Sequence, residues 1–218
     1  MKLFVDTGSI KDIEAIAALG ILDGVTTNPS LLAKEAGDYR QNLKRICDIV
    51  KGPVSGEVTA TDYPGMMRQG HDLAAIDEHI VVKVPLTRDG IRACKAMSTE
   101  GIRVNVTLVF SAAQALLAAK AGAAFASPFV GRLDDVATNG MELIREIVDI
   151  YDNYEFATEV LVASCRHPIH VVEAARMGAD IATCPPAVID QLFNHPLTTI
   201  GLEKFLKDWE KGQVAAKV

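Results

Sequence analysis

A single lysine, Lys83, lies inside the apolar run HIVVKVPLT at residues 79–87. Burial in an apolar environment disfavours the charged form of a lysine, so that a fraction of such side chains becomes the neutral amine. A neutral amine attacks a carbonyl carbon to form a Schiff base, which then accepts the electron pair of an adjacent carbon–carbon bond. This chemistry also requires a general acid or base and a positioned water. Asp6 and Glu57 are the candidate carboxylates, and Thr107 is a candidate to hold the water.

These residues belong to a larger set of polar side chains near the carboxyl ends of strand-like segments. In chain order the set is Asp6, Thr26, Asn28, Glu57, Thr59, Lys83, Asn105, Thr107, Ser127, Arg132, Ser164 and Arg166. One polar residue in a strand carries little information. Seven strands with polar residues at the same end predict a common pocket.

Eight strand-like segments alternate with amphipathic helical patterns along the chain, at residues 2–6, 24–27, 54–60, 80–85, 103–109, 124–130, 159–164 and 179–184. This alternation indicates a parallel sheet, because parallel strands require long crossover connections. Eight units in 218 residues predict an α/β fold, a single (β/α)8 TIM barrel domain over residues 1–218. The alternative is a doubly wound open sheet. An extra C-terminal helix, at about residues 198–212, is expected to pack on a neighbouring subunit.

In such a barrel the carboxyl ends of the strands meet at one mouth, where active sites of this fold lie. Successive side chains of a strand point to opposite faces. On the fourth strand, Val82 and Val84 are therefore expected to face the helices, while Lys83 faces the barrel axis. Lys83 would then point inward among Asp6, Glu57 and Asn105.

Composition narrows the possible functions. Hydrophobic residues make up 49% of the chain and charged residues 23%, as in globular proteins. A net charge of −6 argues against general binding to nucleic acid, which requires a basic face. No apolar run is long enough to span a membrane, and Asp6 interrupts the short N-terminal apolar run, which rules out a signal peptide. We therefore expect a cytoplasmic protein with reduced cysteines.

Neither metal nor nucleotide motifs are present in the sequence. The five histidines and four cysteines lack the spacing of a zinc site, and no Gly-rich phosphate-binding motif follows a strand. The sequence therefore predicts no metal and no cofactor.

The segments FVDT, GVTTNPSLL, VVKVP, NVTLVFS, SPFVGRLDD and VLVAS, in this order, resemble the transaldolase family over essentially the whole chain. The resemblance is to its short-subunit branch, which also contains fructose-6-phosphate aldolase. It implies a (β/α)8 barrel that forms a Schiff base with a ketose phosphate without metal or cofactor. It also implies sugar phosphates as partners, a role in the pentose phosphate pathway, and a homo-oligomer, either a pentamer or a decamer.

The resemblance also implies a role for each polar residue. By position, Lys83 matches the Schiff-base lysine, and Asp6 matches the carboxylate that exchanges a proton with a substrate hydroxyl. Glu57 and Thr107 match the pair that holds the catalytic water. Asn28, Asn105 and Ser127 match substrate-binding positions, and Arg132 and Arg166 fall where phosphate-binding residues are found. Thr26, Phe129 and Ser164 are further candidate substrate-binding residues.

Two positions distinguish members of this family. Its aldolases carry Gln where Glu57 stands and Tyr where Phe129 stands, whereas its transaldolases carry Glu and Phe. A tyrosine hydroxyl could help to protonate and release the three-carbon enamine, and Phe129 cannot donate a proton. The resemblance therefore implies transfer of dihydroxyacetone between sugar phosphates, as in sedoheptulose 7-phosphate plus glyceraldehyde 3-phosphate giving erythrose 4-phosphate plus fructose 6-phosphate. An aldolase that releases free dihydroxyacetone remains an alternative.

A structural reading of the same residues stays open beside the catalytic one. Lys83 could be one half of a buried ion pair in a barrel that binds sugar phosphates without covalent chemistry. Asp6, Ser9 or Asn28 could cap helices, and the two arginines could form surface ion pairs, Arg132 with Asp134 or Asp135.

Overall fold

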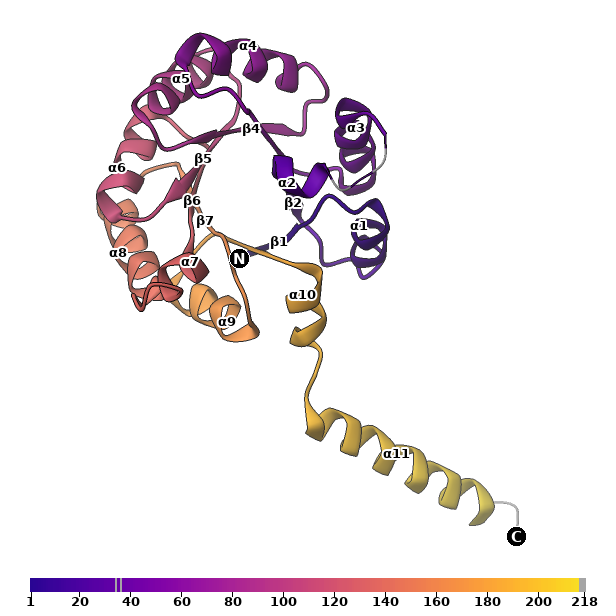
Figure 1. Ribbon diagram of the computed structural model, residues 1–218. Coiled ribbons are helices and arrows are strands. Elements are labelled where there is room, and N and C mark those ends of the chain that lie inside the picture. Colours follow the sequence, from indigo (N-terminus) through magenta and orange to yellow (C-terminus); the bar gives the residue numbers. More distant parts are fainter. Residues whose placement is uncertain (34, 36, 216–218) are drawn as a thin grey trace.

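The computed structural model describes residues 1–33, 35 and 37–215, and it contains eight parallel strands in one closed barrel (Figure 1). Each strand pairs with its sequence neighbours, and the eighth closes on the first. The strands are β1 Lys2–Asp6, β2 Gly24–Thr26, β3 Val54–Glu57, β4 Ile80–Pro85, β5 Val104–Val109, β6 Phe125–Pro128, β7 Glu159–Val162 and β8 Ile181–Cys184. The predicted (β/α)8 barrel is confirmed, and the open sheet is excluded.

Helices surround the barrel and connect its strands. They are α1 Ile10–Ala17, α2 Pro29–Leu32, α3 Tyr39–Val50, α4 Tyr63–Ala74, α5 Arg88–Thr99, α6 Ala112–Ala121, α7 Val130–Asp134, α8 Gly140–Asn153, α9 Pro168–Met177, α10 Pro186–Leu192 and α11 Pro196–Ala215. Most of the helices that follow strands begin at a side chain that accepts a hydrogen bond from a first-turn N–H group, such as Thr87 before α5 and Ser111 before α6. These caps fix where each strand ends and its helix begins.

Apolar side chains form two separate cores, which follow from the alternation along the strands. Between strands and helices lies the larger core, which includes Val82 and Val84 as predicted. Inside the barrel lies a smaller cluster, of which Leu161 and Ala163 also border the mouth cavity. Its buried members are Phe4, Val81, Phe125, Leu161, Ala163 and Ile181. Gly24 leaves room for this cluster, because a Cβ at that position would lie 2.5 Å from the Phe4 ring.

The long helix α11 extends away from the barrel after α10 (Figure 1). Its large apolar side chains are exposed: Leu197, Ile200, Leu202, Phe205, Leu206 and Trp209. The helix was predicted at about residues 198–212, and it begins earlier, at Pro196. Among the described residues, no helix is both long enough and apolar enough to cross a membrane.

Candidate active site at the mouth of the barrel

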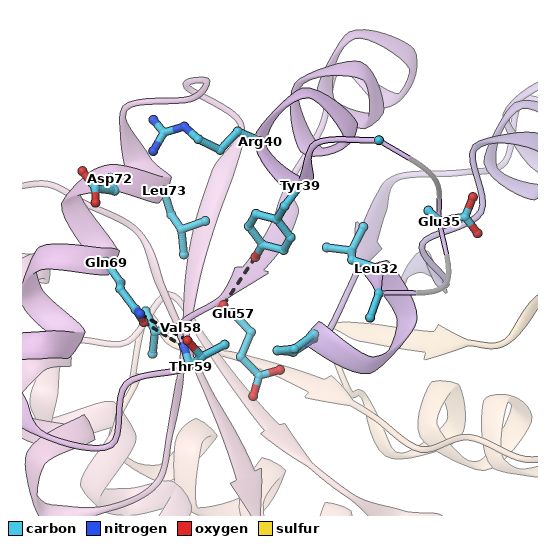
Figure 2. A pocket seen from close by; sticks show the side chains of 13 residues that line it. Leu32, Glu35, Tyr39, Arg40, Glu57, Val58, Thr59, Gln69, Asp72 and Leu73 are labelled. Atoms are coloured by element: carbon cyan, nitrogen blue, oxygen red, sulfur yellow. Dashed lines mark hydrogen bonds between the residues drawn. The ribbon is translucent and has the colours of Figure 1, made fainter.

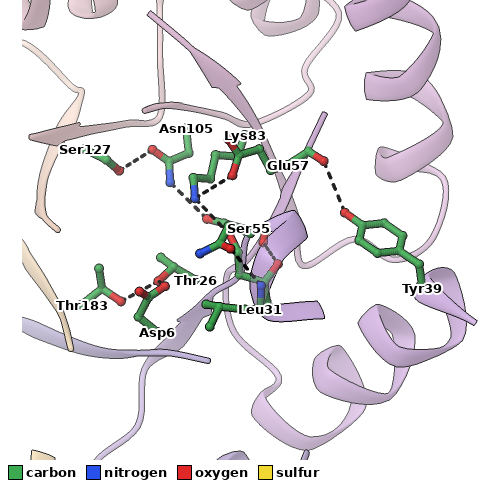
Figure 3. Close-up of polar contacts among 12 residues, drawn as sticks. Asp6, Thr26, Leu31, Tyr39, Ser55, Glu57, Lys83, Asn105, Ser127 and Thr183 are labelled. Atoms are coloured by element: carbon green, nitrogen blue, oxygen red, sulfur yellow. Dashed lines mark hydrogen bonds and ion pairs between the residues drawn. The ribbon is translucent and has the colours of Figure 1, made fainter. Parts of the chain in front are cut away.

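Lys83 lies in the middle of β4 with its ammonium group in the barrel mouth (Figure 3). Its side chain is only 7% exposed. Nζ donates to the Thr27 carbonyl oxygen at 3.0 Å and lies 3.1 Å from Glu57 Oε2. An ammonium group has three hydrogens, so the two contacts found among the described residues leave one hydrogen for a ligand. The ion pair foreseen as a structural role is therefore present, and Lys83 also borders the mouth cavity.

Asp6 ends β1 and shares a buried polar chain with two threonines (Figure 3). Thr26 Oγ1 lies 2.7 Å from Asp6 Oδ1 and 2.7 Å from Thr183 Oγ1. Burial raises the pKa of the Asp6 carboxyl above its ordinary value of 3.8, and the Thr26 hydrogen bond and the Lys83 charge partly oppose this. Ser9, not Asp6, caps α1. Asp6 is therefore a buried carboxyl group that borders the mouth cavity rather than a helix cap.

Asn105 on β5 forms a second polar chain across the mouth. Its Oδ1 accepts a hydrogen bond from Ser127 Oγ at 2.6 Å, and its Nδ2 donates to Ser55 Oγ at 3.1 Å. All three side chains are buried. The two serine hydroxyls hold the Asn105 amide across the mouth, where it borders the cavity.

Thr107 has an unusual environment in the same strand. Among the described residues, its Oγ1 is the one buried side-chain nitrogen or oxygen that lacks a hydrogen-bond partner. The next residue, Leu108, has φ of 59°, and the pairing register of β5 with β6 shifts at this point. A left-handed conformation at a branched residue is costly and concentrates at functional sites. The unsatisfied hydroxyl indicates a place for a ligand or water.

Most of the predicted site residues line one cavity of about 150 Å³ in the mouth. They are Asp6, Thr26, Asn28, Lys83, Asn105, Thr107, Ser127, Phe129, Arg132 and Ser164, joined by Thr183. Glu57 lines the wider opening of about 440 Å³ above it, together with Lys83 and Thr107. Arg166 lines neither cavity.

The two predicted phosphate-binding arginines have different surroundings. Arg132 lies in α7, borders the cavity and has its guanidinium carbon 5.0 Å from the centre of the Phe129 ring. Arg166 pairs through both terminal nitrogens with the Asp135 carboxylate, and its side chain is about half exposed. The ion pair foreseen as the structural alternative for Arg132 is thus found at Arg166. Arg132 is the arginine that faces the mouth.

Two details of the sequence reading require refinement. Asn28 borders the cavity and also caps α2, since its Oδ1 accepts from the Leu31 N–H group at 3.0 Å. The third strand was predicted to extend to residue 60, and it ends at Glu57. Thr59 lies instead in the following loop, where Gln69 Oε1 accepts from its N–H group at 2.8 Å.

Beside the mouth lies a separate, more apolar cavity of about 500 Å³ (Figure 2). Leu32, Tyr39, Val58 and Leu73 contribute its walls, and Glu57 borders both this cavity and the mouth. Burial, and secondarily the nearby Glu57, raise the pKa of Tyr39 to about 12, so its hydroxyl stays protonated. The hydroxyl donates to the Glu57 carbonyl oxygen at 3.4 Å and supports the end of β3.

The four cysteines are buried free thiols, and no cluster of three potential metal ligands is found among the described residues. The polar groups of the mouth are one ammonium, one guanidinium, two carboxylates, hydroxyls and amides around a small cavity. Such a set can bind a polyhydroxylated carbonyl compound and move protons on it. It does not by itself name the compound.

Comparison with known proteins identifies the family. The sequence model described as Transaldolase/Fructose-6-phosphate aldolase matches residues 3–216. The chain belongs to the transaldolase/fructose-6-phosphate aldolase family. A probable transaldolase of Chlorobium limicola is 61% identical over 216 residues, covering 95% of this chain and 97% of the relative. A probable transaldolase of Kosmotoga olearia is 55% identical over 211 residues and covers 97% of each chain.

A more distant likeness concerns the fold alone. Thiamine phosphate pyrophosphorylase from Pyrococcus furiosus aligns with a TM-score of 0.61 at 18% identity, over 86% of each chain. The close relatives therefore identify a transaldolase-family enzyme, whereas the barrel shape alone does not.

Within this transaldolase-family site, the sequence reading missed two buried hydroxyls, those of Ser55 and Thr183. Alternation could have found both, because Ser55 lies two residues before Glu57 and Thr183 two residues after the interior Ile181. The sequence prediction assigned no polar residue to the eighth strand. With Thr183 included, it too contributes a polar side chain to the mouth.

Proposed function

We propose that the protein is a transaldolase, which transfers a dihydroxyacetone unit from a ketose phosphate to an aldose phosphate through a Schiff base on Lys83. The observation that carries the proposal is the buried Lys83 side chain, which borders a polar cavity and whose nitrogen has two protein contacts among the described residues. A lysine with a purely structural role needs no such cavity in front of it.

In the proposed reaction Glu57 accepts a proton from Lys83 Nζ, and the neutral amine attacks the ketose carbonyl carbon. Glu57 returns the proton to the departing hydroxyl, and loss of water gives the iminium. Asp6 then removes the proton of the hydroxyl on C4, and the C3–C4 bond breaks. The electron pair of this bond passes to the iminium and leaves an enamine, while the first aldose phosphate departs. The acceptor aldehyde takes the reverse course, with its new hydroxyl protonated by Asp6. Water finally hydrolyses the iminium and regenerates Lys83.

Water has to be positioned for the first and last of these steps. Glu57, whose Oε2 lies 3.1 Å from Lys83 Nζ, can accept a proton from this water. Thr107 offers a buried hydroxyl without a protein partner among the described residues. Both residues border the same opening as Lys83. A water between them would satisfy the Thr107 hydroxyl and lie next to the iminium carbon.

The remaining cavity residues suit the rest of a sugar phosphate. Asn28, Asn105, Ser127 and Ser164 provide donors and acceptors for hydroxyl groups. Phe129 supports transfer rather than release, because it has no proton to give to the enamine. Release of free dihydroxyacetone, the aldolase reaction, is the competing outcome.

Arg132, rather than Arg166, is proposed to hold most of the phosphate charge. Changing Arg132 to glutamine is expected to raise KM for fructose 6-phosphate about 10- to 100-fold, since it removes a charge-assisted contact. Arg166→Gln is the matched variant, and it should change KM less than about threefold because its exposed guanidinium already pairs with Asp135. Steady-state kinetics of both variants test this. Equal losses in the two would contradict the assignment.

Trapping with borohydride tests the proposed reaction. The protein is incubated with fructose 6-phosphate and borohydride, with and without erythrose 4-phosphate, and its intact mass and peptides are measured. A three-carbon adduct on the Lys83 peptide, depleted by the acceptor, is the expected result. Free dihydroxyacetone accumulating without acceptor would indicate the aldolase, and the absence of any adduct would favour a non-covalent sugar-phosphate-binding barrel.

We also propose that the enzyme is a homo-oligomer, a pentamer or decamer, in which α11 packs on a neighbouring subunit. The support is its row of exposed apolar side chains, including Phe205 and Trp209, which are 72% and 68% exposed. Light scattering of the full chain is expected to give five or ten times the subunit mass of 23.4 kDa. A monomeric mass would contradict the proposal.

A further inference from the structure

Thr183 places a buried hydroxyl in the barrel mouth from β8. Its side chain borders the same cavity as Asp6 and Lys83, and the residue is only 2% exposed. Its hydroxyl oxygen lies 2.7 Å from Thr26 Oγ1, which in turn lies 2.7 Å from Asp6 Oδ1 (Figure 3). Both separations are usual for O–H···O hydrogen bonds. The three side chains therefore form one continuous chain of hydrogen bonds.

Counting hydrogens gives this chain a direction when Asp6 is ionised. A carboxylate only accepts hydrogen bonds, so Thr26 must donate its single hydroxyl hydrogen to Asp6. The Thr26 oxygen can then only accept from Thr183, which must donate. Each hydroxyl hydrogen thus has an acceptor, and the dipoles of both threonines point toward the carboxylate.

Protonation of Asp6 weakens this chain. A hydroxyl donates a stronger hydrogen bond to an ionised carboxylate than to a neutral carboxyl group. Thr183 supports the stronger bond, because it donates its own hydrogen to Thr26 and leaves the Thr26 hydrogen for Asp6. The chain therefore favours the ionised carboxylate over the neutral acid.

We propose that Thr183 is a positioning residue that holds the Thr26 hydroxyl on Asp6 and keeps Asp6 ready to accept a proton. The proposal rests on the proposed function, in which Asp6 removes the hydroxyl proton of the substrate. It gives the eighth strand a part in the reaction without contact between Thr183 and the reacting atoms.

The surroundings of Asp6 make such support useful. Burial raises the pKa of this carboxyl, and the two opposing influences are the Thr26 hydrogen bond and the charge of Lys83. On the side of β7 and β8, the Cys165 thiol interacts with Asp6, and its pKa is raised by its hydrogen bond to Cys184 and by burial. This thiol is therefore neutral at physiological pH. Thr26, which Thr183 orients, supplies the hydrogen bond that opposes the burial effect.

The pH dependence of donor cleavage in Thr183→Val tests the proposal. Valine keeps the shape of threonine but cannot donate, so the acidic limb of kcat should move to higher pH. The rate at a pH on that limb is expected to fall about fivefold, with little change on the plateau and in KM. Thr183→Ser keeps a hydroxyl donor and should show the wild-type pH profile. This variant tests the role of the hydroxyl even if Thr183→Val folds poorly.

Thr158→Val provides the matched control. Thr158 is a buried threonine whose hydroxyl donates to the Ala123 carbonyl oxygen at 2.7 Å, and it borders a different cavity from the mouth. It tests the general effect of losing a buried threonine hydrogen bond. The same shift of the acidic limb in Thr158→Val and Thr183→Val would overturn the proposal, as would an unshifted profile in a folded Thr183→Val.

Two further readouts separate this proposal from the proposed function. Borohydride trapping with fructose 6-phosphate should still yield the Lys83 adduct in Thr183→Val, because the structure shows no hydrogen bond between the two side chains among the described residues. If the wild type itself forms no adduct, the proposed function fails. The proposal for Thr183 can then still be tested by infrared titration of the Asp6 carboxyl, with Asp6→Asn as the blank. Thr183→Val is expected to shift the ionisation of Asp6 to higher pH. An unshifted titration overturns the proposal.

Discussion

Turnover is expected to vanish when Lys83 is replaced by methionine, with a loss of about 10³-fold or more in kcat. Methionine has a similar length and fits a buried position, but it has no nitrogen to form the Schiff base. The borohydride-trapped adduct should disappear together with the activity. Turnover assays and intact mass of the same sample check this result.

Loss of the ion pair with Glu57 could also disturb the barrel, so folding must be checked independently. Circular dichroism and the thermal midpoint of Lys83→Met should remain close to wild type. Lys44→Met is the matched control, because Lys44 is a half-exposed lysine on α3 that pairs with Asp48 and Asp77. It should retain activity. Turnover persisting in Lys83→Met would leave the covalent mechanism without its nucleophile.

Asp6→Asn is expected to separate Schiff-base formation from carbon–carbon bond cleavage. Asparagine accepts the Thr26 hydrogen bond but cannot take a proton, so cleavage should slow by about 10³-fold. The nitrogen of Lys83 is unchanged, and an adduct retaining all six carbons of fructose 6-phosphate should accumulate. Single-turnover cleavage and the mass of the trapped adduct measure the two steps. A three-carbon adduct formed at the wild-type rate would contradict the role of Asp6.

The same variant is expected to be no less stable than the wild type at neutral pH. The pKa of Asp6 is raised in the folded protein, so the folded state binds this proton more tightly than the unfolded state. Its contribution to stability is therefore greatest below 3.8, the ordinary pKa, and falls as pH rises through the raised pKa. Asparagine carries no charge and avoids that loss. A clear drop in the thermal midpoint at neutral pH would contradict this account.

The fold could be predicted from the sequence because its signal is repeated eight times. The placing of Val82 and Val84 against the helices and of Lys83 toward the axis follows from alternation within one strand. The resemblance to a family then implied a role for most of the polar residues, and most of these residues line the mouth cavity. Alternation along a strand predicted correctly which polar residues line the cavity wherever the residue lies within a strand.

Positions beyond strand ends could not be predicted in the same way. The sequence gives no reason for Arg166 to pair with Asp135 while Arg132 faces the mouth, because both follow strands by a few residues. Loop geometry decides between them, including the left-handed Ser164, whose carbonyl oxygen accepts from the Gly131 N–H group. Hydrogen-bond partners such as Ser55 for Asn105 likewise depend on register between strands.

The apolar cluster around Phe4 has a consequence for the order of events. Its side chains pack inside the barrel, and Leu161 and Ala163 also border the mouth cavity of about 150 Å³. In the proposed transfer reaction, so small a cavity favours departure of the first aldehyde before the second approaches the enamine. Ping-pong kinetics, with parallel lines in double-reciprocal plots, are the expected result.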